Sequence, residues 1–183
     1  MAEPTTSVPV PVPVTTPVPG AVRPKQGRPR VVAAAVEQAR RAPVVETLNW
    51  VIENGGSAVL VTADGGDRSP GLHPAVEVVD LRADERRLGL NRIVGTTPAW
   101  SSWNGSKPYR MLRPWLLWRA LRKRLPLLRL DDVDHVIIVH PNSWPIAWHL
   151  HRQHPDLGIA YEIPEAVWQR AGRPVPPRPE PPA

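Results

Sequence analysis

Five side chains that could carry acid–base chemistry or bind a polar ligand follow predicted strands: Glu37, Asp64, His140, Asn142 and Glu162. In an open α/β sheet, ligands bind beyond the carboxyl ends of the strands, and a His or Glu there can act as a general base towards a hydroxyl group. His140 and Glu37 are therefore the candidate catalytic residues. Each side chain also has a structural alternative, since His140 and Asn142 suit caps and Asp64 suits a tight turn. The structural role is favoured for each residue taken alone.

The loops that bind common cofactors are missing from the sequence. A dinucleotide fold needs G-x-G-x-x-G after its first strand, because the backbone must approach the pyrophosphate closely, and residues 37–42 contain no glycine. No G-x-x-x-x-G-K-[ST] loop occurs either. Asp64 stands where a ribose-binding acid would stand, but it is isolated. We therefore expect no cofactor.

Five histidines crowd the region 135–154: His135, His140, His149, His151 and His154. Zinc needs three or four convergent ligands, and the chain has no cysteine. His149 and His151 would point about 160° apart on a helix. Surface histidines are the better interpretation, and no metal is expected.

The stretch 107–129 contains eight cationic residues and no acid, so the net charge of +6 is concentrated there. A helix is predicted from about residue 109 or 112 to residue 125, where Pro126 ends it. Leu117, Leu121, Leu125 and Trp118 would lie towards the core. The rest of this helix forms a candidate membrane or anion patch: Arg113, Trp115, Arg119, Arg122 and Lys123. Arginine beside tryptophan suits an anionic membrane interface. A nucleic-acid phosphate surface is a weaker alternative, and an ordinary solvated helix is the simplest one.

The elements that would position these residues alternate along the chain. Residues 132–162 form the clearest unit, a buried strand at 136–139, a turn, a short helix and another strand at 157–163. The turn carries His140, and Ser143 is a possible N-cap. Further strands are predicted at 31–36, 57–63 and 75–81, the last at a sheet edge because Glu77 and Asp80 interrupt it. The alanines of 31–36 also allow the start of a helix that continues to residue 41. Further helices are predicted at 43–54, ended by the C-cap Asn54-Gly55-Gly56, and at 164–172. This order predicts a three-layer, Rossmann-like α/β fold, an open and mostly parallel sheet with helices on both faces.

Both ends of the chain are rich in proline, which favours extended polyproline conformations over helices or strands. The sequence therefore predicts disordered tails at 1–30 and 172–183 around a single domain at 31–171. The N-terminus lacks the basic and apolar segments of a signal peptide, and no apolar run could span a bilayer. The expected location is cytoplasmic, with a possible peripheral position at the inner membrane face.

Two blocks of the sequence resemble the N-terminal, acceptor-side half of GT-B-fold glycosyltransferases. The first block is RVVAAAVEQARRAPVVETLNWVIENGGSAVLVTAD, and the second is DVDHVIIVHPNSWPIAWHL with the strand that follows. Between them, PYRMLRPWLLWRALRKRL occupies the place of the basic, membrane-facing helix of such enzymes. The resemblance covers about residues 31–165, and it lacks the family's second, donor-binding domain and its Glu-x7-Glu motif.

The resemblance implies where an acceptor or a partner domain would bind. His140 and Asn142 with Ser143 would face the acceptor or the interdomain cleft, as would the Arg40–Arg41 turn, and Asp64 ends a neighbouring strand. The expected function is a glycosyltransferase-like protein that binds an acceptor or partner, needs a separate donor-binding subunit or is catalytically silent, and so is of open enzymatic status. The alternative is a non-enzymatic membrane or protein-interaction module that uses the helix at 109–125.

Overall fold

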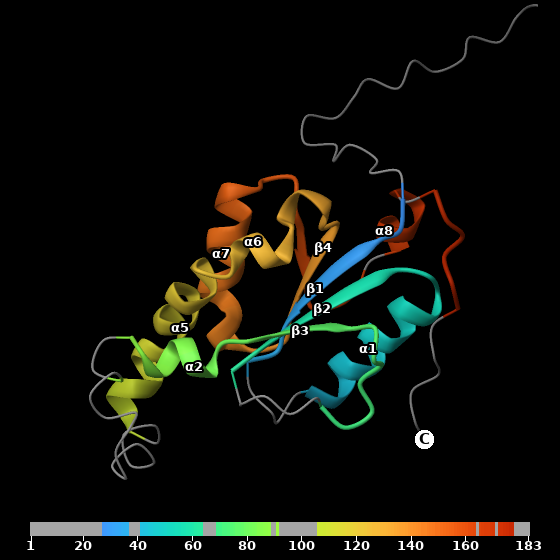
Figure 1. Ribbon diagram of the computed structural model, residues 1–183. Helices are drawn as coiled ribbons and strands as arrows, with labels where there is room; N and C mark the ends of the chain where they lie inside the picture. Colours follow the sequence, from blue (N-terminus) through green and yellow to red (C-terminus); the bar gives the residue numbers. More distant parts are fainter. Residues whose placement is uncertain are drawn as a thin grey trace, which may run out of the picture.

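The computed structural model describes residues 27–36, 41–63, 69–88, 91, 106–163, 165–170 and 172–177. Within these ranges, five strands form one parallel sheet in the order β3-β2-β1-β4-β5 (Figure 1). The strands are β1 (Arg30–Ala34), β2 (Ser57–Thr62), β3 (Glu77–Asp80), β4 (His135–Ile138) and β5 (Gly158–Ala160). This is a Rossmann-like open α/β fold, and the predicted fold class is confirmed.

Helices cover both faces of the sheet (Figure 1). On one face, α1 (Arg41–Glu53) and α8 (Glu165–Arg170) pack over the apolar side chains of β1 and β2. On the other face lie α5 (Lys107–Arg122), α6 (Leu125–Leu128) and α7 (Trp144–Gln153). The short helix α2 (Arg82–Arg86) contacts α5. The domain therefore has two separate apolar cores, one on each side of the sheet.

The central strands are buried on both faces because their sequences are continuous apolar runs. In β1 and β4, every residue is buried, and Val32 pairs with Val136 at the centre of the sheet. The edge position expected for the strand near residues 75–81 is confirmed, since β3 pairs only with β2 among the described strands. Its exposed Glu77 reaches Arg30 through a 3.0 Å ion pair.

Helix α1 begins at Arg41, two residues before the predicted start at Pro43, and ends at the predicted glycines. Gly55 takes a φ of +78°, which a residue with a side chain rarely adopts. After β2, residues 69–76 turn back along α1 and bury Leu72 and Val76 against it. The turn predicted at 64–67 lies outside the described residues.

Helix α5 begins at Lys107, two residues before the predicted start near residue 109. Ser106 caps it by accepting a hydrogen bond from the backbone N–H of Tyr109, and Pro114 lies within it. Our expectation that Pro126 ends this helix was wrong, because α5 ends at Arg122 and Pro126 lies in the first turn of α6. Proline is tolerated there, since first-turn N–H groups have no partner inside the helix.

Buried acids of α2 fix the position of α5. The hydroxyl of Tyr109 donates to the Glu85 carboxylate, and Arg113 Nε donates to the same group over 3.1 Å. Arg124, just beyond α5, makes a 2.9 Å ion pair with Asp84. Helix α2, which the sequence did not predict, is therefore the anchor of the basic helix.

Candidate functional site

The strand order reverses direction between β1 and β4, which is where open α/β sheets place their ligands. The chain leaves β1 towards α1 on one face, and it leaves β4 towards α7 on the opposite face. The carboxyl ends of β1 and β4 therefore meet where the crossover helices α1 and α7 diverge to opposite faces of the sheet.

The turn after β4 forms the 3-10 helix Pro141–Ser143, and its polar groups have structural partners. The backbone N–H of Asn142 donates to His140 Nδ1 over 3.1 Å, so His140 caps this turn. A neutral imidazole whose Nδ1 accepts a hydrogen bond carries its proton on Nε2. His140 therefore has a structural role in this turn, and its catalytic role stays a prediction.

Ser143 is fully buried, and its hydroxyl donates to the carbonyl of Ala34 in β1 over 2.8 Å. Ser143 occupies the N-cap position of α7, as predicted, but its side chain makes no cap hydrogen bond to this helix. Its hydroxyl instead ties the turn after β4 to the end of β1. The ligand-binding role of Ser143 stays a prediction.

Arg41, at the start of α1, is 9% exposed and joins three segments. Its guanidinium donates to Thr62 Oγ1 over 2.6 Å and to Ser69 Oγ over 3.1 Å. These bonds hold the first turn of α1 against the end of β2. The remaining candidates Glu37, Arg40 and Asp64 lie outside the described residues.

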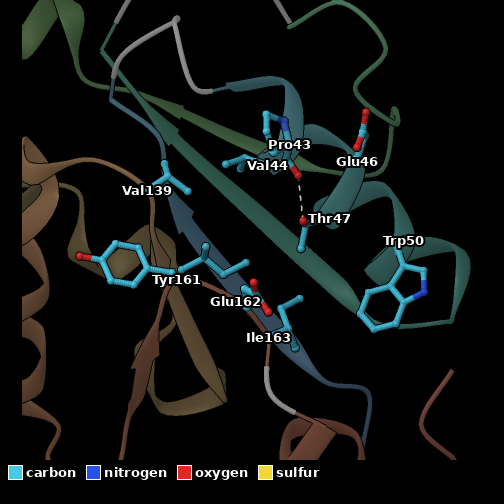
Figure 2. A pocket seen from close by; sticks show the side chains of 10 residues that line it. Pro43, Val44, Glu46, Thr47, Trp50, Val139, Tyr161, Glu162 and Ile163 are labelled. Carbon is cyan, nitrogen blue, oxygen red and sulfur yellow. Dashed lines mark hydrogen bonds between the residues drawn. The ribbon is translucent and has the colours of Figure 1, made fainter. Parts of the chain in front are cut away.

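A cavity of about 490 Å³ opens between α1 and the segment that follows β5 (Figure 2). Ile137 of β4 and Val139, which directly follows β4, form its floor. Figure 2 shows Trp50 and Tyr161 towards opposite sides of this crevice, with the Glu162 carboxylate between them. The complete lining is Pro43, Val44, Glu46, Thr47, Trp50, Ile137, Val139, Tyr161, Glu162 and Ile163. We call it the crevice.

The crevice combines exposed rings with polar groups. Tyr161 is 63% exposed, while Trp50 is half-buried and packs edge-on against Trp168 at 5.1 Å. Glu46 and Glu162 are exposed carboxylates, which accept hydrogen bonds from hydroxyl groups. Glu162 was predicted as a site residue because it follows a strand, and Tyr161 follows the same strand. The lining residues of α1 gave no signal, because they alternate with core residues of the same helix.

A second candidate binding surface is formed by exposed side chains of α5 and α7. Met111, Trp115, Arg119 and Arg122 lie on one exposed face of α5, since they recur at helical spacing. Trp115 is 55% exposed, as the sequence predicted. The cations predicted to lie beside Trp115 differ in their exposure. Arg119, Arg122 and Lys123 are exposed, whereas Arg113 pairs with Glu85.

Helix α7 extends this face with residues that the sequence did not single out. Trp144 and Trp148 are 56% and 52% exposed, and the Arg152 guanidinium lies 5.6 Å from the Trp148 ring. The two helices meet at His149, which stacks on Trp118 at 4.4 Å and contacts the edges of Trp115 and Trp148. Together these exposed residues form one continuous aromatic–basic face, defined by Met111, Trp115, Arg119, Arg122, Lys123, Trp144, Trp148 and Arg152.

The environment of His149 is unusual for a half-buried imidazole. Burial lowers its pKa, and the positive charges of Arg152 and Arg122 lower it further. The neutral form of His149 is therefore the one that fits between the tryptophans near pH 7.

Among the described residues, no cluster of histidines and acids could hold a metal ion, and no helix is long and apolar enough to cross a membrane. No protein-family model matches the sequence, and no curated protein matches it either. The class of the protein therefore follows from its fold, a Rossmann-like open α/β domain.

Proposed function

We propose that the protein is the acceptor-side half of a GT-B-type glycosyltransferase arrangement, and that the crevice binds a sugar-containing acceptor. The observation that carries the proposal is the chemistry of the crevice, two aromatic rings and two carboxylates beside the strand-order reversal. The order of strands and helices, with β4 inside the sheet, agrees with the two sequence blocks that resemble this family. In this proposal, a separate subunit binds the donor.

The lining of the crevice matches the two surfaces of a sugar ring. The C–H face of a pyranose is apolar and packs against aromatic rings such as Tyr161 and Trp50. Its hydroxyl groups donate to carboxylates such as Glu162. A volume of about 490 Å³ lies within the usual range for small-molecule sites, so it accommodates one or two sugar units.

Ligand-observed NMR with a panel of methyl glycosides and disaccharides tests the proposal. We expect at least one sugar to bind the wild-type protein, and Tyr161→Ala and Glu162→Gln to weaken that binding about five- to tenfold each, as expected for one ring contact or one hydrogen bond. Trp148→Ala, on the opposite face of the sheet, is the matched control and leaves sugar binding unchanged. Sugar binding that both crevice variants leave intact would refute the assignment.

Nucleotide-sugars provide a second arm of this experiment. We expect the protein alone to bind free sugars, and to bind a nucleotide-sugar no more tightly than the corresponding free sugar. Tight binding of the nucleotide itself would place a donor site on this chain and contradict the division of roles.

A specific observation favours a second candidate function, docking on an anionic membrane surface. The aromatic–basic face exposes three tryptophans beside four cations over two helices. Tryptophan is stable at the depth of lipid headgroups, and arginine is attracted to anionic lipids. This function is compatible with the first, because the crevice lies on the other face of the sheet.

Co-sedimentation with vesicles tests membrane docking. Each cation near an anionic surface contributes about 1 kcal/mol, so Arg122→Gln lowers binding to phosphatidylglycerol vesicles roughly fivefold. Arg28→Gln is the matched control, because Arg28 is exposed beside the start of β1, away from this face. Trp148→Ala weakens binding as well, whereas Tyr161→Ala does not. Equal losses from Arg122→Gln and Arg28→Gln would reduce the interaction to net charge alone and refute a dedicated face.

A further inference from the structure

The tail predicted to begin at residue 172 makes defined contacts with the domain. Gly172, with a φ of +67°, ends α8, and Arg173 then donates from its backbone N–H to the carbonyl of Trp168 over 2.9 Å. The Arg173 guanidinium donates to the carbonyl of Asn54 at the end of α1, also over 2.9 Å. The chain is thereby directed across the gap between α8 and α1.

The next four residues, Pro174-Val175-Pro176-Pro177, lie along a groove with an aromatic base. Two cavities, of about 270 and 530 Å³, lie beside these four residues, and Trp168 borders both cavities. Trp50 borders the smaller one, and its indole Nε1–H donates to the carbonyl of Pro177 over 2.9 Å. We call the surface formed by Trp50, Ile163, Glu165 and Trp168 the tail groove.

These contacts are of the kind that recognises proline-rich chains. Proline fixes φ near −65° and cannot donate a backbone hydrogen bond, so a run of prolines presents ring surfaces and outward carbonyl groups. Aromatic grooves bind such chains by packing rings against prolines, and the chain loses little entropy because it is already extended. Trp50 and Trp168 meet edge-on at 5.1 Å, and Trp50 supplies the indole donor that such a carbonyl requires.

We propose that the tail groove is a proline-recognition site and that residues 173–177 are its tethered ligand. Trp50 and Ile163 line the crevice as well as the tail groove. Docking of the tail therefore fixes the Trp50 ring at one side of the crevice, and release of the tail frees this ring and the indole N–H together. The proposal concerns a protein-interaction surface and stands whether or not the crevice binds a sugar.

The first experiment measures the tail in the full-length protein. Substitution of Pro174, Pro176 and Pro177 by alanine removes the pyrrolidine rings and the fixed φ angles, while the core of the domain is untouched. In the wild-type protein, we expect the Trp50 indole N–H to exchange with solvent at least tenfold more slowly than that of exposed Trp148. In the triple variant, this protection falls to the level of Trp148. Equal exchange of the two indoles in the wild-type protein would overturn the proposal.

The second experiment supplies the ligand in trans. A synthetic peptide with the sequence of residues 172–180, GRPVPPRPE, is titrated by tryptophan NMR into the wild-type protein and the triple variant. The tethered tail acts at an effective concentration in the millimolar range, so the wild-type protein resists the peptide and the triple variant binds it. A peptide with alanine in place of its prolines does not bind. Failure of the triple variant to bind GRPVPPRPE, or equal binding of the alanine peptide, would overturn the proposal.

A substitution in the groove separates the indole hydrogen bond from general packing. Trp50→Phe, made in the triple variant, keeps a ring but removes the donor, and we expect it to weaken the peptide about fivefold, as for one hydrogen bond. Trp148→Phe is the matched control and leaves peptide affinity unchanged. Equal affinities of the two variants would refute the role of Trp50 as donor.

Discussion

The buried carboxylate of Glu85 is predicted to be the main attachment of α5, and Glu85→Gln tests this directly. Glu85 is 2% exposed and accepts from both the Tyr109 hydroxyl and Arg113 Nε. The substitution keeps the shape of the side chain but removes its charge, which leaves Arg113, only 16% exposed, without its carboxylate.

The expected loss follows from burial. Removing one partner of a buried ion pair costs about 3–5 kcal/mol, and the partial exposure of Arg113 allows water to recover some of it. We therefore expect Glu85→Gln to lower the free energy of unfolding by about 3 kcal/mol, and Tyr109→Phe to lower it by about 2 kcal/mol through loss of one hydrogen bond to a charged group. For a domain of this size, about 3 kcal/mol corresponds to a fall in Tm of roughly 6–12 °C.

Urea unfolding of the two single variants and the double variant gives the measurement. Because both bonds converge on one carboxylate, the double variant should lose less stability than the sum of the single variants. Arg82→Gln, an exposed substitution on the same short helix, is the control and should change the free energy of unfolding by less than about 0.5 kcal/mol. A loss below about 1 kcal/mol for Glu85→Gln would refute the reasoning, and so would strict additivity.

Three further predictions concern single side chains. Ser143→Ala removes the hydroxyl that donates to the Ala34 carbonyl and should cost about 1–2 kcal/mol in thermal unfolding, while Ser143→Thr would add a methyl group to a site without space. Burial and the Glu85 carboxylate raise the pKa of Tyr109, so its contribution to stability is complete below about pH 10 and is lost as the pH rises above it; an alkaline unfolding series should show this loss in the wild-type protein and not in Tyr109→Phe. The lowered pKa of His149 means that the folded state binds a proton at this ring less well than the unfolded state does. The free energy of unfolding should therefore fall as the pH drops below about 6.5. His149→Phe, which retains the ring stacking, should flatten that pH dependence.

The parts of the fold that were predictable are those where one physical signal dominates. The apolar runs that became β1, β2 and β4 favour buried strands at that length, although the alanines of residues 31–36 also allowed a helix, and Gly55 ends α1 because it takes a positive φ. Helix α2 was missed because five residues carry almost no periodicity, and its acids gain their meaning only from Tyr109 and Arg113 in space.

The residues of the candidate sites were also predictable from the sequence only in part. Strand-end position identified Glu162 and the turn around His140, because topology alone places strand ends together. It did not reveal that the imidazole of His140 caps its own turn, since that depends on backbone angles. Trp115 was identified from its place on a basic helix, whereas Trp144 and Trp148 join it only through the packing of α7 beside α5.

The two ends of the described domain meet at one corner. Pro29 accepts a hydrogen bond from the backbone N–H of Ser57, and Arg173 donates to Asn54, three residues earlier in the same turn. A domain whose entry and exit strands adjoin can be inserted into a surface loop of another protein, or circularly permuted, without disturbing its sheet. A permuted chain that joins residue 177 to residue 27 through a short glycine-rich linker, and opens in the exposed turn at Pro74–Ala75, should therefore keep its secondary structure and the protection of its central strands. The same geometry makes this domain a suitable insert for reporter fusions, in which a change at the tail corner is transmitted to the host protein.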